Sequence, residues 1–112
     1  MLNQIVLVGR LTRDIKITKL ENGRKVGTIS LAIPRSFKNV DGTYDTDFID
    51  CVGFENIIEN TSTYCKKGDI VGVKGRVQSR VVEKDGNKEY LMDIIAEKVT
   101  FLSSKKEEKE DK

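Results

Sequence analysis

Hydrophobic and polar residues alternate in residues 45–54 and in much of residues 69–83, and this two-residue period limits the possible folds more than any other feature of the sequence. Two dipeptides typical of tight hairpin turns, Asn22–Gly23 and Asp85–Gly86, and a polar loop around Asp41–Gly42 separate the alternating segments. β-Branched residues are frequent in these segments, which favours strands. Five strands are therefore predicted, at residues 4–12, 26–34, 44–54, 69–83 and 89–102.

One segment, residues 55–68, breaks the two-residue period. Its apolar and small residues recur at steps of three and four, the spacing of one helix face. The members of this stripe are Ile57, Ile58, Thr61, Tyr64 and Cys65. A short helix is predicted here, with Gly68 placed to end it.

This order of elements predicts the fold class. A small sheet avoids open edges by closing into a barrel, and five strands with one helix between the third and fourth are the order of the OB-fold. The prediction is an all-β chain, a five-stranded Greek-key barrel with one short helix between strands 3 and 4. Another small β-barrel with an inserted helix remains the alternative from element order alone.

Length and composition predict one domain with a short tail. Residues 1–102 are enough for a single hydrophobic core. Residues 103–112, with the sequence SSKKEEKEDK, contain no hydrophobic residue and are expected to form a charged mobile tail. No apolar run approaches the length of a membrane span, and the N-terminus lacks the basic flank and cleavage site of a signal peptide. A cytoplasmic protein is expected.

The composition also limits the chemistry. The chain has no histidine, which excludes histidine-based acid–base catalysis, a Ser–His nucleophile and histidine-ligated metal. Its two cysteines, Cys51 and Cys65, lack the CxxC spacing of zinc and redox sites. They are expected to be reduced core residues, with a disulfide as the minor alternative. No group of base, nucleophile or metal ligands is visible, so neither enzymatic activity nor a cofactor is expected.

Charge is distributed unevenly along the chain, although the net charge of +2 is too small to indicate a partner. Residues 10–38 hold eight basic and two acidic residues, residues 39–65 hold six acidic and no basic ones, and residues 66–80 hold five basic and one acidic. In the predicted fourth strand, valines alternate with Lys74, Arg76, Gln78 and Arg80. A row of cations on one strand face suits a phosphate backbone, and a solvated strand face is the plain alternative.

The stretch DTDFIDCVGFEN, residues 45–56, places two phenylalanines on an unexpected face. Ile49 and Cys51 form an ordinary core face, whereas Phe48 and Phe54 share the other face with Asp50. Nucleobases have apolar π-faces beside a charged phosphate, so exposed rings among cations suit a single-strand binder. In an OB barrel, the second and third strands form the face that holds oligonucleotides. A subunit interface or a second apolar layer is the alternative.

These residues belong to longer blocks that carry a family resemblance. The chain resembles the bacterial single-stranded DNA-binding proteins (SSB) from residue 1 to about residue 102. The matching blocks are MLNQIVLVGRLTRD, the NG pair, ISLAIPRSFKN, DFIDCVGF, YCKKGDIVGVKGRVQSR and AEKVTFL, in family order and spacing. The resemblance implies an OB-fold, a homotetramer, no enzymatic activity, and sequence-tolerant binding and protection of single-stranded DNA in replication, recombination, repair or DNA uptake.

The resemblance also assigns a binding site. The stacking aromatics of the family correspond to Phe37, Phe48 and Phe54. Together with the cations noted above, the candidate nucleic-acid-binding residues are Phe37, Phe48, Phe54, Arg10, Arg13, Arg35, Lys38, Lys74, Arg76 and Arg80.

The chain departs from the family pattern in several places. Val82 stands where the family has a fourth aromatic, Asp50 places a negative charge between two rings, and Ile15 replaces a proline. The sequence ends in KKEEKEDK, without the glycine-, proline- and glutamine-rich linker and the acidic D-D-x-P-F tip of chromosomal SSBs. Docking of repair proteins through that tip is therefore not expected. An SSB-derived assembly subunit, as in primosomal proteins, and an RNA-binding OB protein remain as alternative functions.

Overall fold

The computed structural model describes residues 1–104 of the chain. Its elements are β1 (Ile5–Leu11), β2 (Ile17–Lys19), β3 (Lys25–Pro34), β4 (Thr46–Phe54), α1 (Glu55–Tyr64), β5 (Ile70–Lys84) and β6 (Asn87–Ser103). Residues 105–112, to which most of the predicted tail belongs, lie outside the described residues. In the described residues, no helix has the length and apolar character that a membrane crossing needs.

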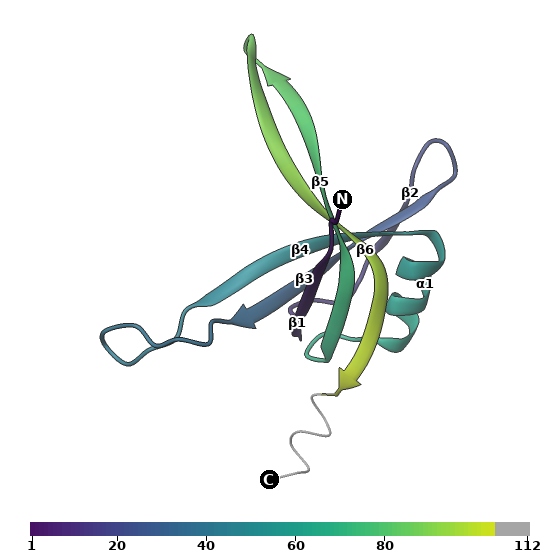
Figure 1. The fold of residues 1–112 in the computed structure, drawn as a ribbon. Coiled ribbons are helices and arrows are strands. Elements are labelled where there is room, and N and C mark those ends of the chain that lie inside the picture. Colours follow the sequence, from purple (N-terminus) through teal and green to yellow (C-terminus); the bar gives the residue numbers. More distant parts are fainter. Residues whose placement is uncertain (105–112) are drawn as a thin grey trace.

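The strands form one sheet that closes on itself. The sheet order is β1-β5-β6-β4-β3-β2, and a second pairing of β1 with β3 joins Arg10 to Ala32 and Leu11 to Leu31. The strands of each pair run antiparallel, except for β4 and β6, which are parallel where Cys51 lies opposite Ile94. Three hairpins project from the closed body (Figure 1). The predicted OB barrel, with its helix between the third and fourth of the expected strands, is confirmed.

The short strand β2 is an addition to the five predicted strands. It pairs with β3 from Ile17 opposite Gly27 to Lys19 opposite Lys25, and it forms a hairpin around the predicted turn. Gly23 has a φ of 86° in that turn. Asn22 accepts a hydrogen bond from the Arg24 backbone N–H (2.9 Å), as an asparagine in a turn commonly does. A strand of three residues is too short to show a two-residue period.

The helix ends earlier than the sequence predicts. α1 stops at Tyr64, and the expectation that Gly68 ends it is wrong. Gly68 lies instead in the next turn, with a φ of 95°. There the Lys66 carbonyl accepts the Asp69 N–H (3.0 Å), and the Asp69 carboxylate accepts the Lys66 N–H (2.7 Å). This side-chain contact competes with the helix for backbone partners and stops it.

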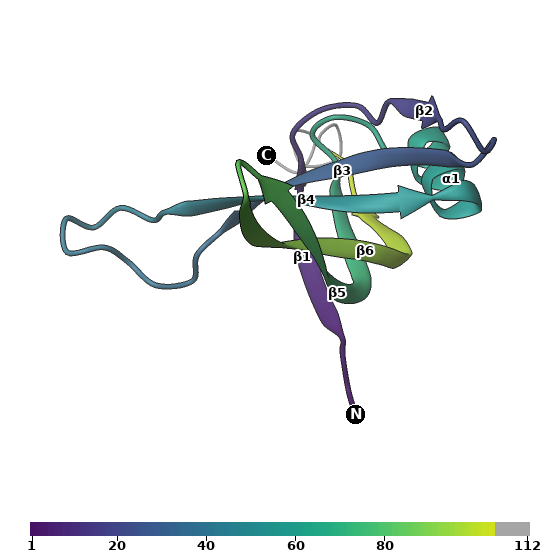
Figure 2. The ribbon, with the colours of Figure 1, turned by 90° about the horizontal axis from the view of Figure 1, so that it is seen from above.

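The core lies inside the barrel, beneath α1. Its buried members are Leu11, Ile29, Leu31, Cys51, Ile58, Cys65, Val71, Val73 and Ala96. Ile58 of α1 packs so closely on Gly27 of β3 that a Cβ at this glycine would clash with it. α1 therefore packs on the inner side of β3 and β4 at one end of the barrel (Figure 2).

Both cysteines are core residues, as predicted. Cys51 is fully buried on β4, and Cys65 is buried directly after α1. Neither forms a disulfide. Burial raises the pKa of the Cys51 thiol to about 11, so this thiol stays protonated near neutral pH.

Candidate nucleic-acid interface

β4 separates the two faces that its sequence predicts. Cys51 points inward and is fully buried, and Ile49 is half-buried against the core. Phe48 points outward with 75% of its surface exposed, and Phe54 is half-buried on the same side. The predicted separation of a core face from an aromatic face is confirmed.

The register of the strands arranges the outward residues of β3 and β4 in rows, because directly opposite residues share a face. We call this surface the outer β3–β4 face. One row joins Arg10, Ala32 and Phe48 across β1, β3 and β4. The far row joins Thr18, Val26 and Phe54 across β2, β3 and β4. The two phenylalanines therefore stand at opposite ends of one continuous sheet surface.

Between these rows, Asp50 has a cationic neighbour. Asp50 lies opposite Ser30 on β3, and the Ser30 hydroxyl accepts a hydrogen bond from Arg13 Nε (3.0 Å). Arg13 Nη2 is 3.9 Å from Asp50 Oδ2, and both side chains are more than half exposed. An exposed pair of this kind is worth about 0–1 kcal/mol, so a phosphate can replace the carboxylate at small cost.

Arg24 is a site residue that the sequence pattern does not reveal. Its guanidinium carbon lies 4.7 Å from the centre of the Phe54 ring, within cation–π range. Its Nε is 3.6 Å from Glu55 Oε1 at the start of α1. In the sequence, Arg24 stands out only by its place after the predicted Asn22–Gly23 turn and among the basic residues of 10–38, and its contact with Phe54 depends on the pairing of β3 with β4.

The cations of β5 continue the outer β3–β4 face. Arg76 lies opposite Ile95 of β6, and Ile95 lies opposite Val52 of β4, so these residues share one side of the sheet. Arg76 Nη1 is 3.2 Å from Glu97, and Arg80 Nε donates to Asp93 Oδ2 at 2.8 Å. These two predicted cations are thus on the same side as the phenylalanines, and each has a carboxylate partner on β6.

Lys74 lies in a different neighbourhood. It is opposite Val6 of β1 and Lys98 of β6, with no β4 residue beside it in the sheet register. A β-bulge between Lys74 and Gly75 separates it from Arg76. The backbone of β6 approaches Gly75 so closely that no Cβ would fit. The register thus separates Lys74 from the other two cations of its strand.

Val82 lies on the side of the β5–β6 hairpin that also carries Arg76 and Arg80. It lies opposite Glu89, and the hairpin turns at Asp85 and Gly86, both with positive φ. On the same side, Arg80 lies opposite Leu91. No aromatic residue therefore stands on this side of the hairpin between Arg76 and its tip.

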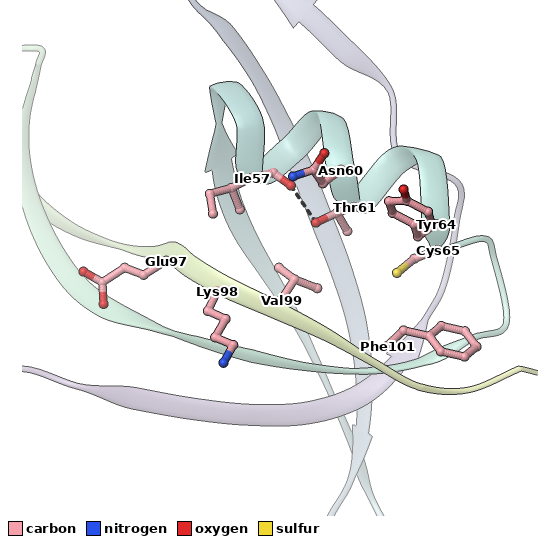
Figure 3. Close-up of a pocket in the computed structure, with 9 residues that line it drawn as sticks. All are labelled: Ile57, Asn60, Thr61, Tyr64, Cys65, Glu97, Lys98, Val99 and Phe101. Atoms are coloured by element: carbon pink, nitrogen blue, oxygen red, sulfur yellow. Dashed lines mark hydrogen bonds between the residues drawn. The ribbon is translucent and has the colours of Figure 1, made fainter.

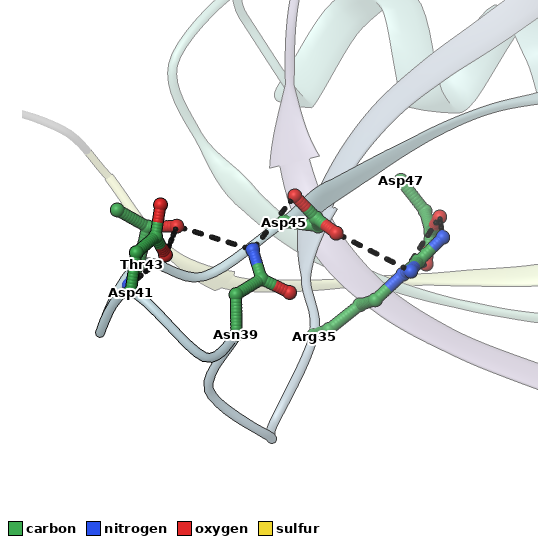
Figure 4. A network of polar contacts seen from close by, with 6 residues as sticks. All are labelled: Arg35, Asn39, Asp41, Thr43, Asp45 and Asp47. Carbon is green, nitrogen blue, oxygen red and sulfur yellow. Dashed lines mark hydrogen bonds and ion pairs between the residues drawn. The ribbon is translucent and has the colours of Figure 1, made fainter.

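The loop between β3 and β4 is held by a polar network around Arg35 (Figure 4). Arg35 Nη2 donates to Asp47 Oδ1 at 2.9 Å, Arg35 Nε lies 3.2 Å from Asp47 Oδ2, and Arg35 Nη1 is 3.5 Å from Asp45. The hydrogen bond between Arg35 and Asp47 raises the pKa of Arg35 and lowers the pKa of Asp47. Asn39 also donates to Thr43 and Asp45, so the loop is internally bonded.

This loop carries the third predicted ring. Phe37 is 63% exposed, and the Lys38 ammonium lies 5.9 Å from the centre of the Tyr44 ring. Arg35 already contacts two carboxylates, whereas Phe37 and Lys38 are exposed on the loop. The structure does not bring these loop residues onto the sheet rows of Phe48 and Phe54.

Arg10 supports the structure as well as the face. Its Nη1 donates to the Gly68 carbonyl at 2.6 Å and so fastens the turn before β5 to β1. A substitution at Arg10 would therefore disturb the fold as well as the binding of any ligand.

A separate hollow of about 290 Å³ lies between α1 and β6 (Figure 3). Its lining residues are Ile57, Asn60, Thr61, Tyr64, Cys65, Glu97, Lys98, Val99 and Phe101. The Thr61 hydroxyl donates to the Ile57 carbonyl (2.7 Å), and Phe101 is 43% exposed at one end. None of the predicted site residues lies here. Among residues 1–104 there is also no cluster of three or more potential metal ligands.

Known proteins are similar to this chain in sequence. The model of the single-strand binding protein family matches residues 2–102. "Single-stranded DNA-binding protein B" of Bacillus subtilis (strain 168) is 41% identical over 110 residues, which are 97% of both chains. "Single-stranded DNA-binding protein 3" of Listeria innocua is 46% identical over 94% of this chain and 66% of its own length.

Solved structures agree with the sequence relatives. A Plasmodium falciparum SSB in complex with ssDNA superposes with a TM-score of 0.75 at 29% identity, over 92% of this chain and 96% of that one. A deletion mutant of the single-stranded DNA binding protein from Thermus aquaticus gives a TM-score of 0.76 at 25% identity, over 93% of this chain and 52% of that one. The chain therefore belongs to the single-strand binding protein family.

Proposed function

We propose that this protein binds single-stranded DNA on the outer β3–β4 face. The observation that carries this proposal is the placement of Phe48 and Phe54 on one open strand face, bordered by arginines from three other segments. Exposed aromatic rings favour burial against a partner. The names of the relatives, and the ssDNA in the Plasmodium falciparum complex, support a single strand as that partner.

The mechanism is equilibrium binding without a chemical step. Bases stack on the phenylalanines, and each stacked base contributes about 1–3 kcal/mol. The exposed pair Arg13–Asp50 and the partly exposed pair Arg80–Asp93 exchange their carboxylates for phosphates, which releases counterions from the DNA. A strand held in this way has its bases unavailable for pairing, which protects it as a single strand.

Binding of this type tolerates any sequence. Every base has a π-face that a phenylalanine can contact, and ring contacts do not read the hydrogen-bonding edges of bases. The arginines of the face contact carboxylates in the free protein and phosphates in the complex, and neither contact distinguishes one base from another. Little sequence preference is therefore expected.

The assembly belongs to the same proposal, with a homotetramer as the functional unit. Val6 and Val8 of β1 are 63% and 51% exposed, and Leu102 of β6 is 50% exposed. Gly72 of β5 lies between Val8 and Leu102 and brings these three side chains onto one surface. In the described residues, β1 pairs with β3 only at Arg10 and Leu11. An apolar surface beside a partly unpaired strand edge favours association with further copies.

The cellular role follows from the binding mode. A cytoplasmic, nucleoid-associated protein that covers single strands would serve replication, recombination, repair or DNA uptake. Size-exclusion chromatography with light scattering tests the assembly, and a mass of four chains is the expected result. A monomer at micromolar concentration would contradict it.

One titration tests the function itself. Fluorescence anisotropy with labelled oligo-dT, oligo-rU and a duplex of equal length should show tight binding to oligo-dT and weak binding to the duplex. Preference for oligo-rU would indicate the RNA-binding alternative. Failure to bind any of the three would indicate an OB subunit whose role is assembly.

A further inference from the structure

A polar hollow of about 460 Å³ lies at the edge of the outer β3–β4 face, between the segment after β1 and strands β2 and β3. Its volume is within the roughly 300–1,000 Å³ range of ligand pockets. The lining residues are Arg13, Asp14, Lys16, Thr18, Val26, Gly27 and Thr28. It is distinct from the hollow between α1 and β6, because the two share no residue. Of its lining residues, only Arg13 is among the candidates predicted from the sequence.

The hollow adjoins the position of Phe54. Thr18, Val26 and Phe54 form one row across three neighbouring strands. Neighbouring strands are about 4.8 Å apart, so Thr18 lies roughly 10 Å from Phe54 along this row. When a base stacks on Phe54, its sugar and phosphate must lie to one side of the ring. A strand that leaves Phe54 along this row therefore carries its backbone over the hollow.

The free groups of the hollow suit a phosphodiester. The Lys16 ammonium has no hydrogen-bond or ion-pair partner within residues 1–104, so its charge is available to a ligand. Lys16 and Thr18 point to the outside, whereas Ile17 between them packs against the core. The hydroxyls of Thr18 and Thr28 add two short donors. A cation beside hydroxyl donors is a common arrangement for phosphate oxygens.

The one carboxylate in the hollow does not oppose this assignment. Asp14 Oδ1 accepts a hydrogen bond from the Lys67 backbone N–H at 2.7 Å, so this oxygen faces the turn before β5. Arg13 Nε is bonded to Ser30, and Arg13 Nη2 lies 3.9 Å from Asp50. Of the two cations in the hollow, Lys16 is consequently the one whose charge has fewer partners within the protein to compete with a ligand.

From this geometry we infer that the hollow binds the phosphodiester adjacent to the base stacked on Phe54. Lys16 supplies the charge, and Thr18 and Thr28 donate hydrogen bonds. β2, which is absent from the five predicted strands, thereby extends the DNA path beyond β3. The inference rests on the proposed function, because it assumes that a base occupies Phe54.

The test compares two lysines of one short segment. Lys19 lies on β2 with the same charge and exposure as Lys16, but it is opposite Lys25 and alternates with Thr18, so it faces the other side. Affinity for oligo-dT is measured by anisotropy between about 50 and about 200 mM salt. Lys16→Ala should reduce the log–log salt slope by about 0.7, the value for one phosphate on a single strand. The ratio of the wild-type affinity to the Lys16→Ala affinity should then fall about 2.5-fold from the lower to the higher salt concentration. Lys19→Ala should have the same affinity and salt slope as the wild type.

A second pair of variants removes ambiguity. Lys16→Glu should change the salt slope in the same direction by a larger amount, and Thr18→Val with Thr28→Val should weaken binding by a factor that salt does not alter. Equal slopes for Lys16→Ala and Lys19→Ala, with Phe54→Ala still weakening binding, would overturn this inference and leave the proposed function intact. If Phe54→Ala also has no effect, the proposed function fails first.

Discussion

The outer β3–β4 face and the β5–β6 hairpin carry different parts of the proposed single-strand binding site. The face has two rings, Phe48 and Phe54, and its cations come from segments beside it. The hairpin has Arg76 and Arg80 but presents Val82 on the side where a ring would stand. Stacking carries no net charge, whereas phosphate binding weakens with salt. The contribution of the rings and the contribution of the hairpin cations should therefore differ in their dependence on ionic strength.

Ion pairs in the free protein also limit the positive charge of these two regions. Five arginines in and around the two regions have an acidic partner in the free protein. The pairs are Arg13–Asp50, Arg24–Glu55, Arg35–Asp47, Arg76–Glu97 and Arg80–Asp93. These pairs are at least partly exposed, so they are weak and exchangeable. In the proposed site, these arginines can exchange their carboxylates for phosphates.

The largest effect is expected from the rings. Phe54→Ala and Phe48→Ala should each weaken oligo-dT binding by about 1–3 kcal/mol, roughly 5- to 140-fold, because each removes one stacking surface. The decrease in affinity should be similar at low and high salt. Anisotropy titrations measure it, and thermal unfolding should show that both variants remain folded. Phe101→Ala, in the hollow between α1 and β6, is the matched control and should lose stability before affinity.

A ring restored on the hairpin should have the next largest effect. Val82→Tyr adds a stacking surface beside Arg80, so it should tighten oligo-dT binding by about 1 kcal/mol. This gain should persist at high salt, in contrast to a gain from charge. Val81→Tyr, on the opposite side of the same strand, is the control. Equal gains from both variants would mean that the hairpin does not present one defined side to the DNA.

Removal of the hairpin cations should alter the salt dependence. The double variant Arg76→Ala and Arg80→Ala should flatten the log–log slope by about 0.7 for each phosphate that is no longer neutralised, without a change in base preference. Titrations at several salt concentrations give the slope. Lys74→Ala should have a smaller effect, because Lys74 lies beside Val6 and Lys98 on the other side of the bulge. An unchanged slope in the double variant would place the DNA away from the hairpin.

The smallest effect is expected at Asp50. Asp50→Asn removes a negative charge between the two rings and releases Arg13 for a phosphate, so binding should tighten slightly at low salt and not at high salt. Because the pair is exposed, the gain should be below about 1 kcal/mol. The same change in an Arg13→Gln background shows how much of the gain comes through Arg13. A gain that survives high salt would contradict an electrostatic origin.

Much of the fold follows from local patterns in the sequence. The two-residue period of residues 45–54 separates Cys51 from Phe48 because side chains of a strand must alternate, and the structure has the same two faces. The turns at Gly23 and Gly86 were predictable because each glycine has the positive φ that such turns require. The presence of β2 and the end of α1 were not predictable from local patterns. β2 depends on its pairing with β3, and α1 ends before the turn in which the Asp69 carboxylate accepts the Lys66 N–H.

The candidate site was predictable in its rings but less so in its charges. The two-residue period of each strand shows that Arg76 and Phe48 point outward. Only the register of β4, β5 and β6 shows that both lie on the same side of the sheet. The carboxylate partners of the arginines are distant in sequence: Asp50 is on β4 and Asp93 is on β6. Arg24 and Lys16 were missed for the same reason, because their neighbours come from other strands.

Photo-crosslinking tests most directly the claim that the outer β3–β4 face holds the bases. Oligo-dT with 5-iodo-deoxyuridine at every third position is bound to the wild-type protein, irradiated and digested, and the linked residues are identified by mass spectrometry. Crosslinks should occur at Phe48 and Phe54 and should disappear at each ring that is replaced by leucine. Crosslinks at Tyr64 or Phe101, beside the hollow between α1 and β6, with none at Phe48 or Phe54, would contradict the account.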